Sequence, residues 1–186
     1  ARPPEIPMPS AEIEENAVWK DWLARNGNRL FLFARQQTRS EADAHDVFQD
    51  ACLRLWKSGI TDTDTEGREE PSLAAAFTQI RRSAIDQARK NIRRANREQR
   101  AIDFGEAQTF TMFEDSTEGD ERAQEVERAI TGLPDYYREV VMLKIWGELT
   151  FDQIAETLDI PMNTAASRYR YALQKLRRSL NPAKLS

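Results

Sequence analysis

The C-terminal part of the chain contains the pattern that most restricts its fold. Residues 150–158 form a short amphipathic segment that begins with a threonine in the N-cap position and has Gln153 three residues later, as in a capping box. Pro161 then disfavours helical geometry at the residue before it. A second, arginine-rich helix is predicted over 164–180, with Asn163 as its cap and Leu173 in its apolar stripe. Two helices joined by a short turn, the second one basic, are typical of a helix-turn-helix that reads the DNA major groove.

The same pattern also fits a plain helical hairpin with a solvated basic face, and short motifs match by chance often enough to leave both interpretations open. The distribution of charge favours nucleic acid. The formal net charge is −4, but basic residues are concentrated over 81–100 and in the C-terminal helix, with an acidic segment over 103–121 between them. Local clusters of charge determine the electrostatic potential near a bound polyanion, so the two basic patches matter more than the net charge of the whole chain.

Composition argues against several classes of protein. Cys52 is the only cysteine, so an internal disulfide and a cysteine-based zinc cluster are excluded. It is expected to be a small buried hydrophobe beside Phe48 and Leu55. One histidine, His45, leaves little room for histidine-based catalysis, and we find no nucleotide-binding glycine loop, metal-ligand cluster or Ser/His/Asp constellation. We therefore expect no enzymatic activity and no cofactor.

The sequence has no apolar run long enough to span a membrane and no signal-peptide pattern. We expect a cytoplasmic protein without membrane insertion.

Apolar residues recur at helical spacing along most of the chain, and we find no alternating strand pattern and no internal repeat. The predicted class is all-α, with two small helical bundles joined by an acidic linker, the C-terminal one a helix-turn-helix. Within the first bundle we predict a helix break near Gly27 and a polar loop over 58–72. Between them we predict a helix that is capped by Ser40 and has Trp56 on its apolar face. The predicted boundaries are a disordered tail at 1–9, a first bundle at 10–98, the linker at 99–121 and a second bundle at 122–181.

Three stretches carry a resemblance to a known family. Residues 42–56 read A-D-A-H-D-V-F-Q-D-A-C-L-R-L-W, residues 84–86 read A-I-D and are followed by arginines, and residues 133–168 contain L-P, R-E-V-V and the helix-turn-helix. In this order and at this spacing they resemble the bacterial extracytoplasmic-function (ECF) sigma factors, the small group with only sigma regions 2 and 4. One departure is that Ala165 and Ala166 stand where the family often has a bulky aliphatic residue and then lysine or arginine.

The resemblance implies a transcription initiation factor that binds core RNA polymerase through the β′ clamp helices and the β flap, and directs it to specific promoters. The first bundle would recognise and melt the −10 element, and the helix-turn-helix would read the −35 element. It also raises an anti-sigma factor as a partner. The acidic linker is either a soluble tether or a segment that threads the polymerase towards the RNA exit path.

The resemblance also assigns residues to these roles. The positions that match the polymerase-docking stripe, which we expect to be exposed, are Asp46, Gln49, Asp50 and Arg54. Candidate phosphate contacts at the −10 element are Arg81, Arg82, Arg89, Lys90, Arg93 and Arg94. Candidates at the −35 element are Thr164, Ala166, Ser167, Arg168 and Tyr171 for base edges, and Arg170 and Lys175 for phosphates. Among these, Arg168 is the residue most expected to specify sequence.

A second hypothesis is a helix-turn-helix regulator that binds operator DNA as a dimer, without polymerase. It accounts for the C-terminal bundle, but it leaves the helix at 42–56 and the first basic stretch without a role. A stable homodimer would favour it.

Overall fold

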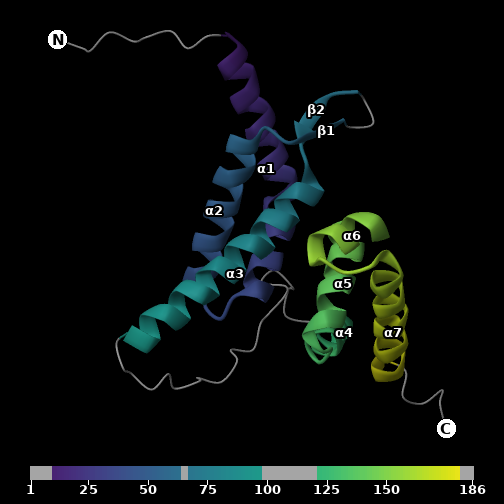
Figure 1. Cartoon of the computed structure of the whole chain (residues 1–186). Coiled ribbons are helices and arrows are strands. Elements are labelled where there is room, and N and C mark those ends of the chain that lie inside the picture. Colours follow the sequence, from purple (N-terminus) through teal and green to yellow (C-terminus); the bar gives the residue numbers. More distant parts are fainter. Residues whose placement is uncertain (1–9, 64–66, 98–120, 181–186) are drawn as a thin grey trace.

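The computed structural model describes residues 10–63, 67–97 and 121–180 of the 186-residue chain. Within these residues, seven helices and one two-stranded hairpin form two bundles that pack against each other (Figure 1). The first bundle comprises α1 (Ser10–Gln37), α2 (Glu41–Ser58), β1 (Thr61–Thr63), β2 (Glu69–Pro71) and α3 (Leu73–Arg97). The second comprises α4 (Glu121–Thr131), α5 (Asp135–Ile145), α6 (Phe151–Leu158) and α7 (Met162–Leu180). The all-α prediction is confirmed, and the predicted tail and nearly all of the predicted linker lie outside the described residues.

A single helix, α1, continues through the position where the sequence predicts a break. Glycine inside a helix costs only about 1 kcal/mol, and Gly27 is followed by Leu30 and Phe33, whose side chains are fully buried. The buried Asn26 side chain donates a hydrogen bond to the Trp22 carbonyl one turn earlier, at 2.9 Å. The predicted break was wrong, because burial of the apolar face outweighs the local cost of the glycine.

Capping residues determine where α2 begins and ends. The Ser40 hydroxyl accepts a hydrogen bond from the Asp43 N–H at 3.0 Å, which is the predicted N-cap. Gly59, with φ 61°, ends the helix in the left-handed conformation that glycine adopts without strain. Two expectations for its apolar face need correction, since Trp56 is 40% exposed and Cys52 is only partly buried.

A short hairpin occupies the segment predicted as a polar loop over 58–72. Strand β1 pairs antiparallel with β2, with Thr61 opposite Pro71. Each strand has only three residues, so no alternating pattern identifies it in the sequence. An ion pair between Glu70 of β2 and Arg25 ties the hairpin to α1. The expectation of no strand was wrong here.

The helix-turn-helix is the most accurately predicted part of the chain. Thr150 caps α6, and the reciprocal hydrogen bonds between Thr150 and Gln153 form the expected capping box. Asp159, with φ 54°, ends α6, and α7 begins at Met162, two residues before the predicted start. The predicted cap at Asn163 was wrong, because this residue lies inside the first turn of α7. Leu173, expected in the apolar stripe of α7, is instead 40% exposed.

The buried apolar side chains of the two bundles belong to one hydrophobic cluster. The largest buried apolar side chains of the first are Leu30, Phe33, Val47, Leu55, Phe77 and Ile80. Those of the second are Val140, Val141, Met142, Leu143 and Ile154. The bundles meet where α3 packs on α6, and the Phe77 ring lies against Gly147 in the turn after α5.

The described part of the chain contains neither a membrane-spanning helix nor a metal-binding cluster. No helix there is long and apolar enough to cross a membrane. In the same residues, no group of three or more histidine, cysteine, aspartate or glutamate side chains is arranged to hold a metal ion.

Candidate nucleic-acid and protein interfaces

The four candidate docking residues of α2 fall into two kinds. Asp46 and Gln49 are exposed and have no role in packing that the structure reveals. Asp50 is half-buried: it accepts a hydrogen bond from the Ser83 hydroxyl of α3 at 2.6 Å and pairs with Arg54 at 2.8 Å. The expectation that all four form one exposed stripe needs correction, because Asp50 and Arg54 also hold α2 against α3.

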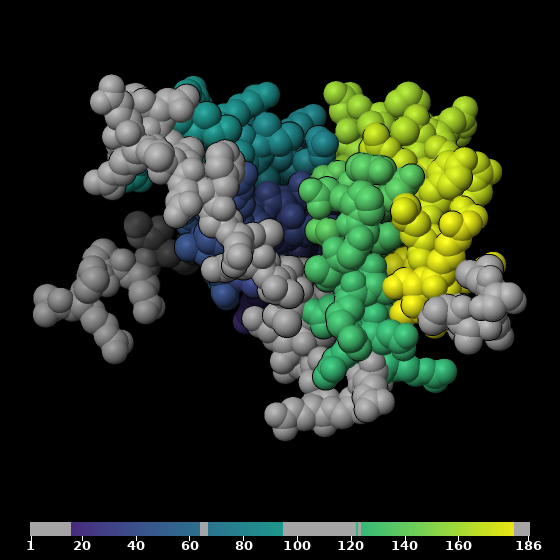
Figure 2. All heavy atoms as spheres, turned by 90° about the horizontal axis from the view of Figure 1, so that it is seen from below, coloured from purple at the N-terminus to yellow at the C-terminus, as the bar shows by residue number. Residues whose placement is uncertain are grey.

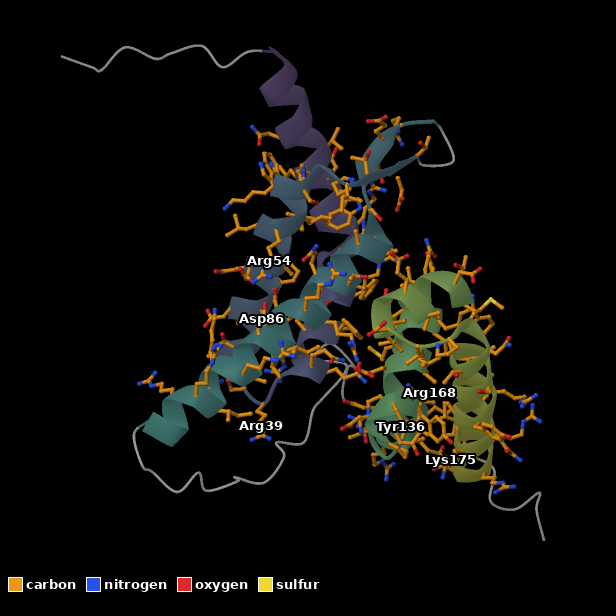
Figure 3. All side chains as sticks on the ribbon, in the orientation of Figure 1. Arg39, Arg54, Asp86, Tyr136, Arg168 and Lys175 are labelled. Carbon is orange, nitrogen blue, oxygen red and sulfur yellow. The ribbon has the colours of Figure 1, made fainter. Side chains whose placement is uncertain are left out.

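Arg54 makes a second contact across the two helices. Its guanidinium lies 3.4 Å from the Asp86 carboxylate of α3, and Figure 3 shows the two side chains on facing helices. Asp86 is the acidic residue of the A-I-D segment, so two of the stretches that resemble the family are joined by this pair. All three side chains of the Asp50–Arg54–Asp86 chain are partly exposed, which limits what each ion pair contributes to stability.

A shallow cleft of about 320 Å³ runs between α2 and α3 beside these residues. Its rim is mainly polar, and Leu53 is its most exposed apolar side chain, at 59%. The cleft is lined by Asp46, Val47, Gln49, Asp50, Leu53, Ser83, Asp86, Gln87 and Lys90. Leu53 is not among the predicted docking residues, although its position four residues after Gln49 places it on the same outward face. An exposed leucine among carboxylates and amides suits a protein–protein contact.

The basic residues of α3 are not equivalent. Arg82, Arg89, Lys90, Arg93 and Arg94 are exposed along the helix. Arg81 is half-buried and faces Glu139 of α5, with 3.8 Å between Nε and the nearer carboxylate oxygen. Lys90 lines the cleft between α2 and α3. Arg81 therefore lies against the second bundle, where its buried Nε is near Glu139 but makes no hydrogen bond within the described residues.

The candidate residues of α7 spread around the helix. Arg170, Tyr171 and Lys175 are exposed, and the Arg170 guanidinium lies 5.3 Å from the centre of the Tyr171 ring. Ser167 donates its hydroxyl hydrogen to the Thr164 carbonyl at 3.0 Å. The candidates Ala166 and Arg168 are partly buried at the flanks of the helix.

Arg168 is partly buried, and its guanidinium faces α5. Its guanidinium lies over the ring of Tyr136, 5.6 Å from the ring centre, in the space between α5 and α7 (Figure 3). Tyr136 in turn packs against Tyr137, with ring centres 4.4 Å apart. No local sequence pattern predicts that these tyrosines contact the basic helix, because 32 positions separate Tyr136 from Arg168.

The contact between the bundles is polar as well as apolar. The hydroxyl oxygens of Thr78 on α3 and Thr157 on α6 lie 3.1 Å apart. Arg29 of α1 donates to the Trp146 carbonyl at 3.1 Å and lies 3.4 Å from the Glu148 carboxylate. In the space-filling view, the green residues of α4 and α5 lie between the first bundle and the yellow α7 (Figure 2). The arrangement thus covers the start of α3 and leaves α7 on the outer side.

Comparison with known proteins matches both bundles to one family. The family model described as Sigma-70 region 2 matches residues 22–94. The model described as Sigma-70, region 4 matches residues 123–176. These segments include the α2–α3 cleft and the helix-turn-helix.

Similar curated proteins are ECF RNA polymerase sigma factors called SigK. The protein from Mycobacterium ulcerans (strain Agy99) is 27% identical over 157 residues, which cover 82% of this chain and 80% of the relative. The protein from Mycobacterium tuberculosis (strain ATCC 25618 / H37Rv) is 24% identical over 171 residues, which cover 90% and 88%. Among solved structures, the sigma factor RpoE in complex with the anti-sigma factor NepR from Bartonella quintana has a TM-score of 0.62 and 20% identity. That match covers 88% of this chain and 97% of the RpoE chain, and it supports the fold.

Proposed function

The chain belongs to the extracytoplasmic-function sigma factors, which are non-enzymatic factors of transcription initiation, and from this premise we propose how its two bundles divide the work. In this proposal it binds core RNA polymerase and directs it to specific promoters. The first bundle recognises and melts the −10 element, and the helix-turn-helix reads the −35 element. Both partners are cytoplasmic, and we place the protein there.

The observation that carries the proposal is the α2–α3 cleft. It combines an exposed apolar residue, Leu53, with the exposed polar side chains Asp46 and Gln49. A helical partner such as the β′ clamp helices would bury Leu53 and satisfy the surrounding polar groups, which is how a small protein interface gains affinity. The Asp50–Arg54–Asp86 chain keeps the two walls of the cleft at a fixed spacing.

The DNA-binding part of the proposal rests on the two exposed basic surfaces. On α3, Arg82, Arg89, Arg93 and Arg94 would contact phosphates of the −10 region, and Arg81 would join them only when Glu139 moves away. On α7, Arg168 and the residues of the first turns would meet base edges, while Arg170 and Lys175 contact phosphates. The rest of the second bundle is left to contact the β flap.

The inhibitor seen with the solved relative suggests the same class of partner for this chain. The RpoE structure contains the anti-sigma factor NepR. We propose that an anti-sigma factor would act here by covering the α2–α3 cleft or by holding the two bundles in their packed arrangement.

Co-elution with core RNA polymerase on a size-exclusion column tests the docking surface. Asp50→Arg would break contacts to Ser83 and Arg54, so a failure to bind could reflect loss of folding. Gln49→Arg and Leu53→Asp change exposed side chains and are the better variants. Asp62→Arg, which changes an exposed residue of β1, is the matched control. We expect wild type and Asp62→Arg to co-elute with core enzyme, and Gln49→Arg and Leu53→Asp to separate from it.

Clean separation of the wild-type protein from core enzyme would overturn the proposal. A stable homodimer that binds duplex DNA in the same experiment would instead support the polymerase-independent regulator.

A further inference from the structure

Arg168 has an unusual environment for a candidate base-reading residue. Several other arginines, among them Arg54, Arg81 and Arg138, each lie within 4.0 Å of a carboxylate. Within the described residues, Arg168 has no such carboxylate and instead lies over the face of the Tyr136 ring. The two kinds of contact differ in how many N–H donors of the guanidinium remain available for another acceptor.

A carboxylate partner occupies the N–H edge of a guanidinium, while an aromatic partner occupies its face. The contact of Arg168 with the ring, at 5.6 Å from the ring centre, pairs none of its five N–H donors with a carboxylate. An arginine held in this way is restrained in position and still free to donate to an acceptor. Guanine presents N7 and O6 in the major groove, and both are acceptors that a guanidinium contacts in a bidentate manner.

The site that holds Arg168 is rigid on the side of α5. Tyr136 lies in the first turn of that helix, and its ring rests on Tyr137. The preceding turn is fixed by Arg138, which donates to the Leu133 carbonyl at 2.7 Å and to the Thr131 carbonyl at 2.8 Å. Tyr136 is still 47% exposed, so the contact lies at the surface, where DNA can approach.

We propose that Tyr136 is a positioning residue that holds Arg168 in the orientation needed to read guanine in the −35 element. The inference rests on the proposed function, since it assigns to the same recognition helix the residue that prepares it for binding. Tyr136 does not touch the base in this mechanism. It restricts the Arg168 side chain before DNA binds, so that less conformational entropy is lost on binding, which is the general gain from preorganisation.

Two substitutions of Tyr136 distinguish the contribution of its aromatic ring from those of its side-chain volume and its hydroxyl group. Tyr136→Phe keeps the ring and removes only the hydroxyl. Tyr136→Leu keeps apolar volume and removes the π face. An exposed cation–π contact corresponds to an effect of about two- to fivefold, so we expect Tyr136→Leu to reduce sequence preference by that factor and Tyr136→Phe to preserve it.

The experiment uses the full chain with core RNA polymerase and a pool of linear templates whose −35 and −10 segments are randomised. Sequencing the run-off transcripts gives the base preference at every position for wild type, Arg168→Ala, Tyr136→Leu, Tyr136→Phe and the double variant Arg168→Ala/Tyr136→Leu. We expect Arg168→Ala to abolish the preference for guanine at one −35 position. Tyr136→Leu should weaken the preference at that position alone, and the double variant should match Arg168→Ala. Melting curves of the same proteins report whether folding is preserved.

Three results would overturn the inference. Tyr136→Leu could leave the preference unchanged, or it could reduce transcription equally from all templates, which would indicate a phosphate contact or a loss of stability. Arg168→Ala could itself leave the base preference intact, in which case Arg168 is not the reader and Tyr136 cannot act through it. In that third case, formation of the holoenzyme and a persistent −35 preference in the same samples would show that the proposed function stands while this inference fails.

Discussion

The hydroxyl groups of Thr78 and Thr157 lie 3.1 Å apart and connect α3 of the first bundle to α6 of the helix-turn-helix. Thr157 is buried, so this hydrogen bond is shielded from water. The nearby pair of Arg81 and Glu139 lies on the same contact. A residue proposed to bind −10 phosphates thus faces a carboxylate of the second bundle in this arrangement.

Charge reversal at the Arg81–Glu139 pair should open this arrangement. Glu139→Arg places a second guanidinium against Arg81 in a partly buried site, where like charges repel. We expect a larger radius of gyration in small-angle scattering and faster proteolysis between the bundles. Asp152→Arg, which changes an exposed residue of α6, is the matched control. An unchanged scattering profile for Glu139→Arg would show that the pair does not hold the bundles together, and recovery in Arg81→Glu/Glu139→Arg would confirm that it does.

The free protein should bind promoter duplex weakly even though α7 is uncovered. The net charge of −4 gives no long-range attraction to a polyanion, so the basic surface of α7 has to hold duplex DNA through its short-range contacts alone. We expect fluorescence anisotropy to detect specific binding of a −35 duplex only when core enzyme is present. Nanomolar specific binding by the free monomer would contradict both this prediction and the dependence on polymerase.

Two glycines provide opposite tests of packing. A Cβ on Gly147 would lie 2.5 Å from the Leu143 carbonyl oxygen and 3.1 Å from the Phe77 ring, so backbone has to move. We expect Gly147→Ala to lower the free energy of unfolding by about 1–3 kcal/mol. A Cβ on Gly27 meets nothing within 4 Å inside α1, so Gly27→Ala should raise the free energy of unfolding by about 0.5–1 kcal/mol. Urea unfolding of both variants checks the two signs, and a stabilising Gly147→Ala would mean that the turn after α5 relaxes freely.

The elements that sequence analysis predicted correctly are those fixed by neighbouring residues. The N-caps at Ser40 and Thr150 follow from a hydroxyl and a side chain three positions later, and both are confirmed. The break at Gly27 was predicted from the residue alone, and it was wrong because buried neighbours on α1 sustain the helix. The hairpin after α2 escaped prediction because its strands are short and exposed, and a long-range ion pair to Arg25 holds it.

The candidate site was predictable as a set of residues but not as a set of contacts. Periodicity and resemblance identify α2, α3 and α7 as the functional helices. They do not show that Asp50 accepts from Ser83, that Arg81 faces Glu139 or that Arg168 rests on Tyr136. Each of these pairs joins residues that are more than 30 positions apart, and such pairs depend on how helices pack and not on local pattern.

The capping box of α6 should contribute measurably to stability. Thr150 accepts a hydrogen bond from the Gln153 N–H at 3.2 Å, and the Gln153 side chain accepts one from the Thr150 N–H at 2.8 Å. Thr150→Ala removes the first of these, and we expect it to lower the free energy of unfolding by about 1 kcal/mol. Thr150→Ser keeps the hydroxyl and should behave like wild type in the same urea titration. Equal losses for the two variants would show that the methyl group, and not the cap, is responsible.

The partly buried thiol of Cys52 gives a prediction for pH dependence. Burial raises the pKa of the Cys52 thiol to about 11 from its ordinary value of 9.0. At neutral pH the folded protein should therefore react with iodoacetamide about a hundredfold more slowly than a free thiol, with a rate that keeps rising beyond pH 9. Because the folded-state pKa is the higher one, the neutral thiol favours folding below pH 9, and that contribution is lost as pH rises towards 11. Stability measured from pH 8 to 10.5 should fall more steeply for wild type than for Cys52→Ala, which isolates the thiol from other groups that titrate in the same range. An alkylation rate that levels off near pH 9, or identical pH profiles for the two proteins, would show that Cys52 is as accessible to water as a free cysteine.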